Sequence, residues 1–116
     1  MTDSLSNPRK SLDPSPDAMR ALGYELVDEV VNYLTTQRDQ PVARRGTRDD
    51  FSSIVDEHLP ESGQGAADSL EFFFRRIVPD MTSVNHPRFH AYIPGPSSYA
   101  GALGAMLAAG TNPFVG

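Results

Sequence analysis

The stretch MTSVNHPRFHAYIPGPSSYAGALGAMLAAGTNPFVG, residues 81–116, contains a single charged side chain, Arg88. Every other Lys, Arg, Asp and Glu residue of the chain precedes Met81. A segment that faces water rarely runs this long without charge, so we expect protein to cover it. Residues 1–80 are too polar to cover it well. We therefore expect the chain to be an incomplete piece of a larger protein, with part of its function encoded elsewhere.

The composition favours an open helical segment over a compact domain. The 116 residues include ten prolines and nine glycines, and hydrophobic residues make up only 39%. A net charge of −5 argues against nucleic-acid binding. One basic cluster lies among aspartates, which favours a solvated loop and leaves a polyanion contact as the alternative. The cluster comprises Arg38, Arg44, Arg45 and Arg48.

Three absences in the sequence bear on location. The chain has no cysteine, which fits a reducing compartment. Its first 16 residues, MTDSLSNPRKSLDPSP, lack the apolar core of a signal peptide. No apolar stretch is long enough for a membrane span. We therefore expect a cytoplasmic protein that binds neither membrane nor nucleic acid.

Periodicity and punctuation predict a mainly α fold with extended connectors. A helix over 17–38 starts at Ser15-Pro16 and carries an apolar stripe at helical spacing. The stripe needs a partner surface; its residues are Met19, Leu22, Leu26, Val27, Val30, Tyr33 and Leu34. The remaining expected elements are a helical turn within 49–58, a helix over 66–78, an extended segment over 84–96, and a helix over 98–109 that Ser97 caps and Gly110 ends.

The residues offer little catalytic chemistry of their own. His86 and His90 have the spacing of metal ligands on a helix, but Pro87 argues against a helix there, so we interpret His86 as a hydrogen-bonded structural residue. His58 is expected to be exposed. Ser97 lacks a paired base and acid. The only lysine is Lys10, so chemistry that needs a buried lysine cannot be completed by this chain.

The segment HPRFHAYIPGPSSYAGALGAML, residues 86–107, resembles the N-terminal region of the group II pyridoxal-phosphate-dependent amino-acid decarboxylases. The shared pattern is a His-Pro-x-Phe turn, an aromatic and proline region, and Ser-Ser-Tyr opening a helix of small residues. Upstream, an amphipathic helix, a proline-rich connector and a second helix agree with the same family. The resemblance covers roughly residues 17–116.

The resemblance implies an N-terminal segment of the aspartate-aminotransferase-like fold, fold type I. It divides the chain into a disordered arm at 1–14, a helical dimerisation segment at 15–80, and the beginning of the transferase-type domain at 81–116. It implies a homodimer through the N-terminal helices. It also implies pyridoxal 5'-phosphate as the cofactor, with the imine-forming lysine outside this chain and no cofactor-binding or catalytic residue within it.

Several positions of the family's substrate pocket can be carried over. Tyr92, Ile93, Pro94 and Gly95 match a Tyr-aromatic-Pro-Thr loop that lines the pocket for the substrate side chain. Ile93 replaces an aromatic residue and Gly95 a hydroxyl residue, which argues against a catechol or indole substrate. Phe114 matches a position that reaches the neighbouring subunit's pocket. For Tyr92, an aromatic packed in a dimer interface is an equal alternative to a pocket wall.

The implied function is part of a carboxy-lyase that converts an amino acid to an amine, with the 116-residue chain inactive alone. Two alternatives stay open. One is a non-enzymatic helical interaction module derived from such an enzyme. The other is a family member that synthesises an aldehyde.

Overall fold

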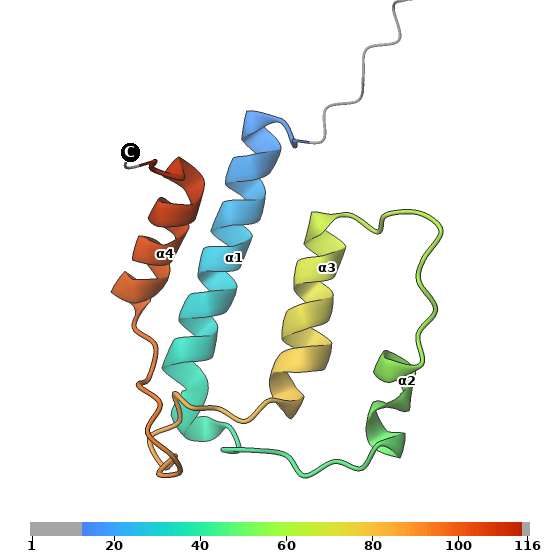
Figure 1. The fold of residues 1–116 in the computed structure, drawn as a ribbon, viewed down its shortest axis with the longest axis vertical. Helices are drawn as coiled ribbons and strands as arrows, with labels where there is room; N and C mark the ends of the chain where they lie inside the picture. Colours follow the sequence, from blue (N-terminus) through green and yellow to red (C-terminus); the bar gives the residue numbers. More distant parts are fainter. Residues whose placement is uncertain (1–12, 115–116) are drawn as a thin grey trace, which may run out of the picture.

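The computed structural model describes residues 13–114, and within this range the chain is helical and has no strands. The mainly α prediction is thus confirmed. Figure 1 shows α1 (Pro16–Thr36) between α3 (Ala66–Phe72) and α4 (Tyr99–Thr111), with their axes roughly aligned. The arm expected at 1–14 lies outside the described residues except for its last two.

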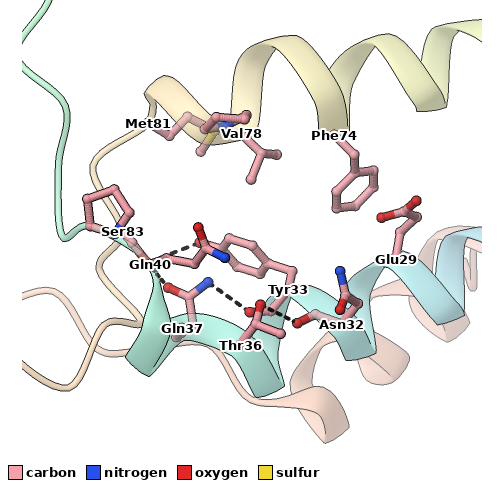
Figure 2. Close-up of a pocket in the computed structure, with 12 residues that line it drawn as sticks. Glu29, Asn32, Tyr33, Thr36, Gln37, Gln40, Phe74, Val78, Met81 and Ser83 are labelled. Atoms are coloured by element: carbon pink, nitrogen blue, oxygen red, sulfur yellow. Dashed lines mark hydrogen bonds between the residues drawn. The ribbon is translucent and has the colours of Figure 1, made fainter.

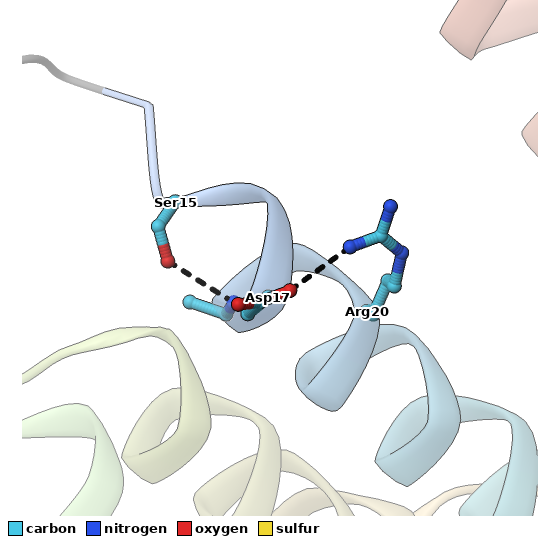
Figure 3. A network of polar contacts seen from close by, with 4 residues as sticks. Ser15, Asp17 and Arg20 are labelled. Atoms are coloured by element: carbon cyan, nitrogen blue, oxygen red, sulfur yellow. Dashed lines mark hydrogen bonds and ion pairs between the residues drawn. The ribbon is translucent and has the colours of Figure 1, made fainter.

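The first helix begins as the sequence predicts. The Ser15 hydroxyl accepts a hydrogen bond from the Ala18 amide at 3.2 Å, and Pro16 occupies the first helical position. Arg20 pairs with Asp17 at 3.0 Å one turn away, as Figure 3 shows. Both of these side chains are exposed, so the pair stabilises the helix start only slightly. At its other end α1 tightens into the 3₁₀ turn η1 (Gln37–Asp39).

The connector after α1 contains one short helical unit, where the sequence predicts a turn. It consists of η2 (Asp49–Phe51) followed by α2 (Ser52–Val55). The Phe51 ring folds back over Gly46 so closely that a Cβ atom at residue 46 would clash with it. Glycine at this position therefore lets the connector turn tightly around the ring.

The second predicted helix is interrupted rather than continuous. The α-helical part, α3, ends at Phe72 and is followed by a π-helical turn, η3 (Phe73–Ile77), and a 3₁₀ turn, η4 (Val78–Asp80). Pro79 has no amide proton, so a regular α-helix cannot continue through it. The rings of Phe73 and Phe74 meet edge to face with centroids 5.5 Å apart. The prediction of a helix over 66–78 is right in extent and wrong in its hydrogen-bonding pattern.

Two details of the last helix correct the sequence-based expectation. The cap is Ser98, whose hydroxyl accepts a hydrogen bond from the Gly101 amide at 3.0 Å, and not Ser97. The helix continues through Gly110 to Thr111, and the capping residue after it, Asn112, adopts a left-handed conformation with φ 39°. Asparagine tolerates this conformation better than most residues, so it can replace glycine as the terminating residue.

No apolar side chain is buried among the described residues. The buried side chains in this range are polar: Gln37, Ser83 and His86. The apolar stripe of α1 meets α3 on one side, but its residues Met19 and Leu26 stay exposed. Tyr24 and Val31 elsewhere on α1 are exposed too, and so are Leu103, Met106 and Leu107 of α4. The described helices therefore leave substantial apolar surface uncovered. None of them has both the length and the apolarity required to cross a bilayer.

The cap assignment can be tested with two adjacent serines. We expect Ser98→Ala to raise the exchange rate of the Gly101 amide about fivefold, because a lost N-cap costs about 1 kcal/mol. Ser97→Ala should leave that amide unchanged, since the Ser97 side chain bonds to Asn85 instead. Amide hydrogen exchange followed by NMR measures both. A slower or equal rate in Ser98→Ala would contradict the assignment.

Candidate functional site

A network of polar side chains joins the end of α1 to the segment that follows η4. The Ser83 hydroxyl donates to Gln37 Oε1, and the Tyr33 hydroxyl lies 3.3 Å from Ser83 Oγ. Because the Ser83 proton is already donated, Tyr33 is the donor in its pair with Ser83. Gln37 Nε2 donates to the Tyr33 carbonyl at 2.8 Å, which closes the circuit. We call Gln37, Ser83 and His86 the polar clasp.

His86 completes the clasp with both ring nitrogens. Its Nδ1 accepts a hydrogen bond from the Arg88 amide at 3.0 Å, so the proton resides on Nε2, which donates to the Gln40 carbonyl at 2.9 Å. The side chain is 2% exposed. The expectation of a hydrogen-bonded structural histidine is confirmed. His58 is exposed, also as expected.

The extended segment expected over 84–96 begins instead with two tight turns. The His86 amide donates to the Ser83 carbonyl at 3.2 Å, and the Phe89 amide donates to the His86 carbonyl at 2.9 Å. Each is a four-residue turn closed by a bond from the fourth amide to the first carbonyl, and Pro87 occupies the second position of the turn that starts at His86. The segment expected to be extended therefore forms hydrogen-bonded turns up to Phe89 and lacks them only beyond that residue.

A groove of about 180 Å³ lies beside the clasp, between α1 and the η3–η4 segment. Figure 2 shows Tyr33 and Gln37 on one wall and Phe74, Val78 and Met81 on the other. The lining includes no lysine, arginine or histidine, so the groove has no cationic group to hold a phosphate. None of the predicted substrate-binding residues lines it.

Four of the five predicted substrate residues, 92–95, lie on a loop, residues 85–97, that is tied at its base. Asn85 Oδ1 accepts two hydrogen bonds from Ser97, from the amide at 2.7 Å and from the hydroxyl at 3.0 Å. The tip projects into solvent, with Tyr92 92% and Ile93 100% exposed. Pro94 and Gly95 are exposed as well. Tyr92 has φ 62°, a left-handed conformation that is costly for a residue with a bulky side chain.

The structure does not bring Phe114 to this loop. Phe114 follows the carboxyl end of α4, whereas the loop leads into its amino end. A 13-residue helix is about 20 Å long. Phe114 is 94% exposed. Within one chain, the two parts of the predicted substrate site therefore lie at opposite ends of a helix (Figure 1).

The arginines of the connector form ion pairs near the protein surface. Arg44 lies 3.5 Å from Asp80, and Arg48 lies 3.9 Å from Asp56. Residues 13–114 contain no group of three or more His, Cys, Asp or Glu side chains arranged to hold a metal ion. Asp50, also in the connector, accepts two hydrogen bonds from Thr47. The backbone amide of Thr47 and then its hydroxyl hold the pKa of Asp50 below the ordinary 3.8, against a small opposing effect of burial.

Sequence reasoning missed three anchoring residues: Gln37, Ser83 and Asn85. Gln37 and Ser83 are ordinary polar residues in the sequence, and they bind each other across a separation of 46 positions. Asn85 carried a usable signal. An asparagine shortly before a proline is typical of a turn, because its side-chain oxygen accepts backbone hydrogen bonds.

Comparison with known proteins finds amino-acid decarboxylases among the relatives of this chain. The chain is 33% identical over 105 residues to an aromatic-L-amino-acid decarboxylase of Bacillus atrophaeus, which covers 90% of this chain and 22% of that protein. It is 36% identical over 101 residues to human histidine decarboxylase, covering 84% of this chain and 15% of the relative. This chain is a homologue of the group II pyridoxal-phosphate-dependent amino-acid decarboxylases.

The same comparison includes an aldehyde-forming relative. A 3,4-dihydroxyphenylacetaldehyde synthase of Aedes aegypti is 33% identical over 94 residues, covering 81% of this chain and 18% of the relative. The chain spans about a fifth of the length of the curated relatives it matches. No family model matches the chain. No solved structure matches it either.

The effect of pH on the connector follows from the Asp50 geometry. Because its folded-state pKa lies below the unfolded value, Asp50 stabilises the turn at Thr47 fully above pH 3.8, and this contribution is lost as pH falls through the folded pKa. We expect the NMR titration of the Asp50 carboxyl to have its midpoint below 3.8.

A matched pair of variants checks the cause. Asp50→Asn should remove this acid dependence and loosen α2, whereas Asp49→Asn should preserve both, since no hydrogen bond is recorded for the Asp49 side chain. The readout is protection of the amides of α2 across the acid range. Equal behaviour of the two variants would contradict the assignment.

Proposed function

We propose that this chain is the N-terminal part of a fold type I, pyridoxal-phosphate-dependent amino-acid decarboxylase, in which it shapes the substrate pocket of a homodimer. The observation that supports it most is the match to decarboxylases over 90% of the chain, which includes the loop that carries Tyr92. In this proposal residues 15–80 form the dimerisation segment and residues 81–116 begin the transferase-type domain.

We further propose that the described residues do not hold the cofactor by themselves. They contain no lysine, and the groove beside the clasp has no basic side chain. An imine with a carbonyl cofactor and a cradle for its phosphate both need such groups. The proposal therefore assigns cofactor binding and proton transfer to residues outside this chain. It assigns to this chain the positioning of the loop tip and the exclusion of water around the substrate side chain.

The arrangement of Tyr92 and Phe114 supports a shared site between two copies. Both side chains are almost fully exposed, and they lie at opposite ends of α4. A pocket that uses both residues must combine the loop of one copy with Phe114 of another. Exposed apolar side chains on α1 supply surface for such an interface, because burying apolar area drives association.

A segment exchange tests the proposal. The segment of the Bacillus atrophaeus relative that matches this chain over 105 residues is replaced by the corresponding residues of this chain. We expect the exchanged protein to bind pyridoxal phosphate and to release carbon dioxide from at least one member of an amino-acid panel. The 116-residue chain alone, mixed with the cofactor, is the negative control. A folded, cofactor-loaded exchange protein without activity would contradict the proposal.

Substrate preference should respond to Ile93. We expect Ile93→Phe in the exchanged protein to raise kcat/KM for aromatic relative to aliphatic amino acids about tenfold, the effect of one apolar contact in a pocket. Leu59→Phe is the control, since Leu59 is 94% exposed and lies in the connector. If Leu59→Phe produced the same change, a role of the loop in specificity would be excluded.

Aldehyde synthesis is a second candidate reaction, favoured by the similarity to the Aedes aegypti synthase. The two reactions differ in their products from the same amino acid, an amine or an aldehyde. Measuring the amounts of amine and aldehyde formed in the segment-exchange assay decides which of the two reactions this chain favours.

Assembly provides a further prediction. We expect the chain to sediment as a dimer, and Met19→Glu to weaken the dimer about thirtyfold, because it places a charge on the apolar stripe of α1 where Met19 is 48% exposed. Leu59→Glu introduces the same charge outside the helices and should leave the dimer intact. Sedimentation velocity over a concentration series measures the effect. A monomer at all concentrations would contradict the proposed interface.

A further inference from the structure

Hydrogen bonds hold the base of the loop over residues 85–97, whereas its tip makes none. Among the described residues, the recorded hydrogen bonds of this loop involve Asn85, His86, Arg88, Phe89 and Ser97. Residues 90–96 make none, and all of them are exposed. The position of the tip therefore depends on how its base is held.

Two side-chain tethers hold that base, and one of them reaches a distant part of the chain; the backbone adds a bond from the His86 amide to the carbonyl of Ser83, whose own amide binds the Val42 carbonyl. Asn85 and Ser97 bind each other across the neck, which closes the loop without attaching it elsewhere. His86 binds outward, to the Gln40 carbonyl just after α1, while its other nitrogen fixes the Arg88 amide inside the loop. Among the side chains of the loop, the His86 imidazole is thus the one that bonds to the segment following η1.

The backbone conformation of Tyr92 is the feature of the tip that this coupling can affect. An aromatic residue at φ 62° is strained, and such conformations persist only where the surroundings impose them. The tip has no hydrogen bonds that could impose it. We infer that the base of the loop imposes this conformation. His86 lies at that base and is the most buried of the three buried polar residues, Gln37, Ser83 and His86.

We propose that His86 is a positioning residue for the Tyr92 loop, acting through its simultaneous bonds to the Gln40 carbonyl and the Arg88 amide. The inference rests on the proposed function for the importance of the loop, but not for the mechanical coupling itself. It assigns two separable tasks to the two nitrogens: Nε2 fixes the loop to Gln40, the residue after η1, and Nδ1 fixes the internal turn.

Two isosteric substitutions separate these tasks in the intact 116-residue chain. In His86→Asn the amide oxygen takes the place of Nδ1, so the bond from the Arg88 amide is retained and the bond to Gln40 is lost. In His86→Gln the amide nitrogen takes the place of Nε2, so the bond to Gln40 is retained and the turn is freed. His86→Ala removes both. His90→Ala is the control, because His90 is exposed on the same loop and makes no recorded hydrogen bond.

The readouts are amide hydrogen exchange and ¹⁵N relaxation of residues 85–97. We expect the Arg88 amide to exchange about tenfold faster in His86→Ala and His86→Gln, the loss expected from one hydrogen bond, and to stay protected in His86→Asn. Relaxation should report a more mobile tip in all three variants and an unchanged tip in His90→Ala. Protection of the α1 amides verifies that each variant is folded. If His86→Ala does not fold, the Asn and Gln pair alone decides the question.

The outcomes separate this inference from the proposed function. An unchanged tip in the His86 variants, or equal protection of Arg88 in His86→Asn and His86→Gln, would overturn the role of His86 whatever the enzyme activity. A loosened tip supports it. The same substitutions in the segment-exchange protein then test the loop: a loosened tip with unaltered substrate preference supports the coupling and overturns a pocket role for Tyr92.

Discussion

The described fold depends on hydrogen bonds between the end of α1 and the segment that follows η4. Gln37, Ser83 and His86 are buried, and together they satisfy one another or a neighbouring backbone group. Buried polar groups are costly when unpaired, so the network tolerates few alternative geometries. The described residues have no buried apolar side chains whose packing could fix the position of α1 relative to the segment after η4, so this hydrogen-bond network fixes it instead.

The candidate site inherits its geometry from that network. The loop with Tyr92 and Ile93 begins at Asn85, two residues after Ser83, so both clasp residues from this segment lie at its base. The tip itself contacts little and presents apolar side chains to solvent. A rigid base with an exposed tip suits a loop that completes a pocket on another surface, because it reaches that surface with little conformational entropy left to lose.

Much of the helical layout could be predicted from the sequence. The start of α1 follows from Ser15 and Pro16, and the helices follow from apolar periodicity and from proline positions. The failures were local. Ser97 and Ser98 are equivalent as caps in sequence, and the choice between them depends on Asn85, which reaches Ser97 only in the folded chain. The π turn at η3 likewise leaves no periodic signature that distinguishes it from an α-helix.

The candidate site was less predictable than the fold. The resemblance to decarboxylases identified the loop by its Tyr-x-Pro pattern, since such a motif is local in sequence. It could not identify Gln37 or Ser83, because their roles arise from pairing across 46 positions. His86 was correctly interpreted as structural because Pro87 excludes the helix that metal binding would need. Its coupling of α1 to the loop appears only when both partners of its ring are known.

The uncovered apolar surface of α1 and α4 has a thermodynamic consequence. When most hydrophobic stabilisation is gained at an interface, the unfolding free energy contains a mass-action term and rises with the logarithm of protomer concentration. Folding and assembly then form one equilibrium, and a substitution on the outer face of a helix can lower the melting temperature as much as one in the interior of a conventional domain.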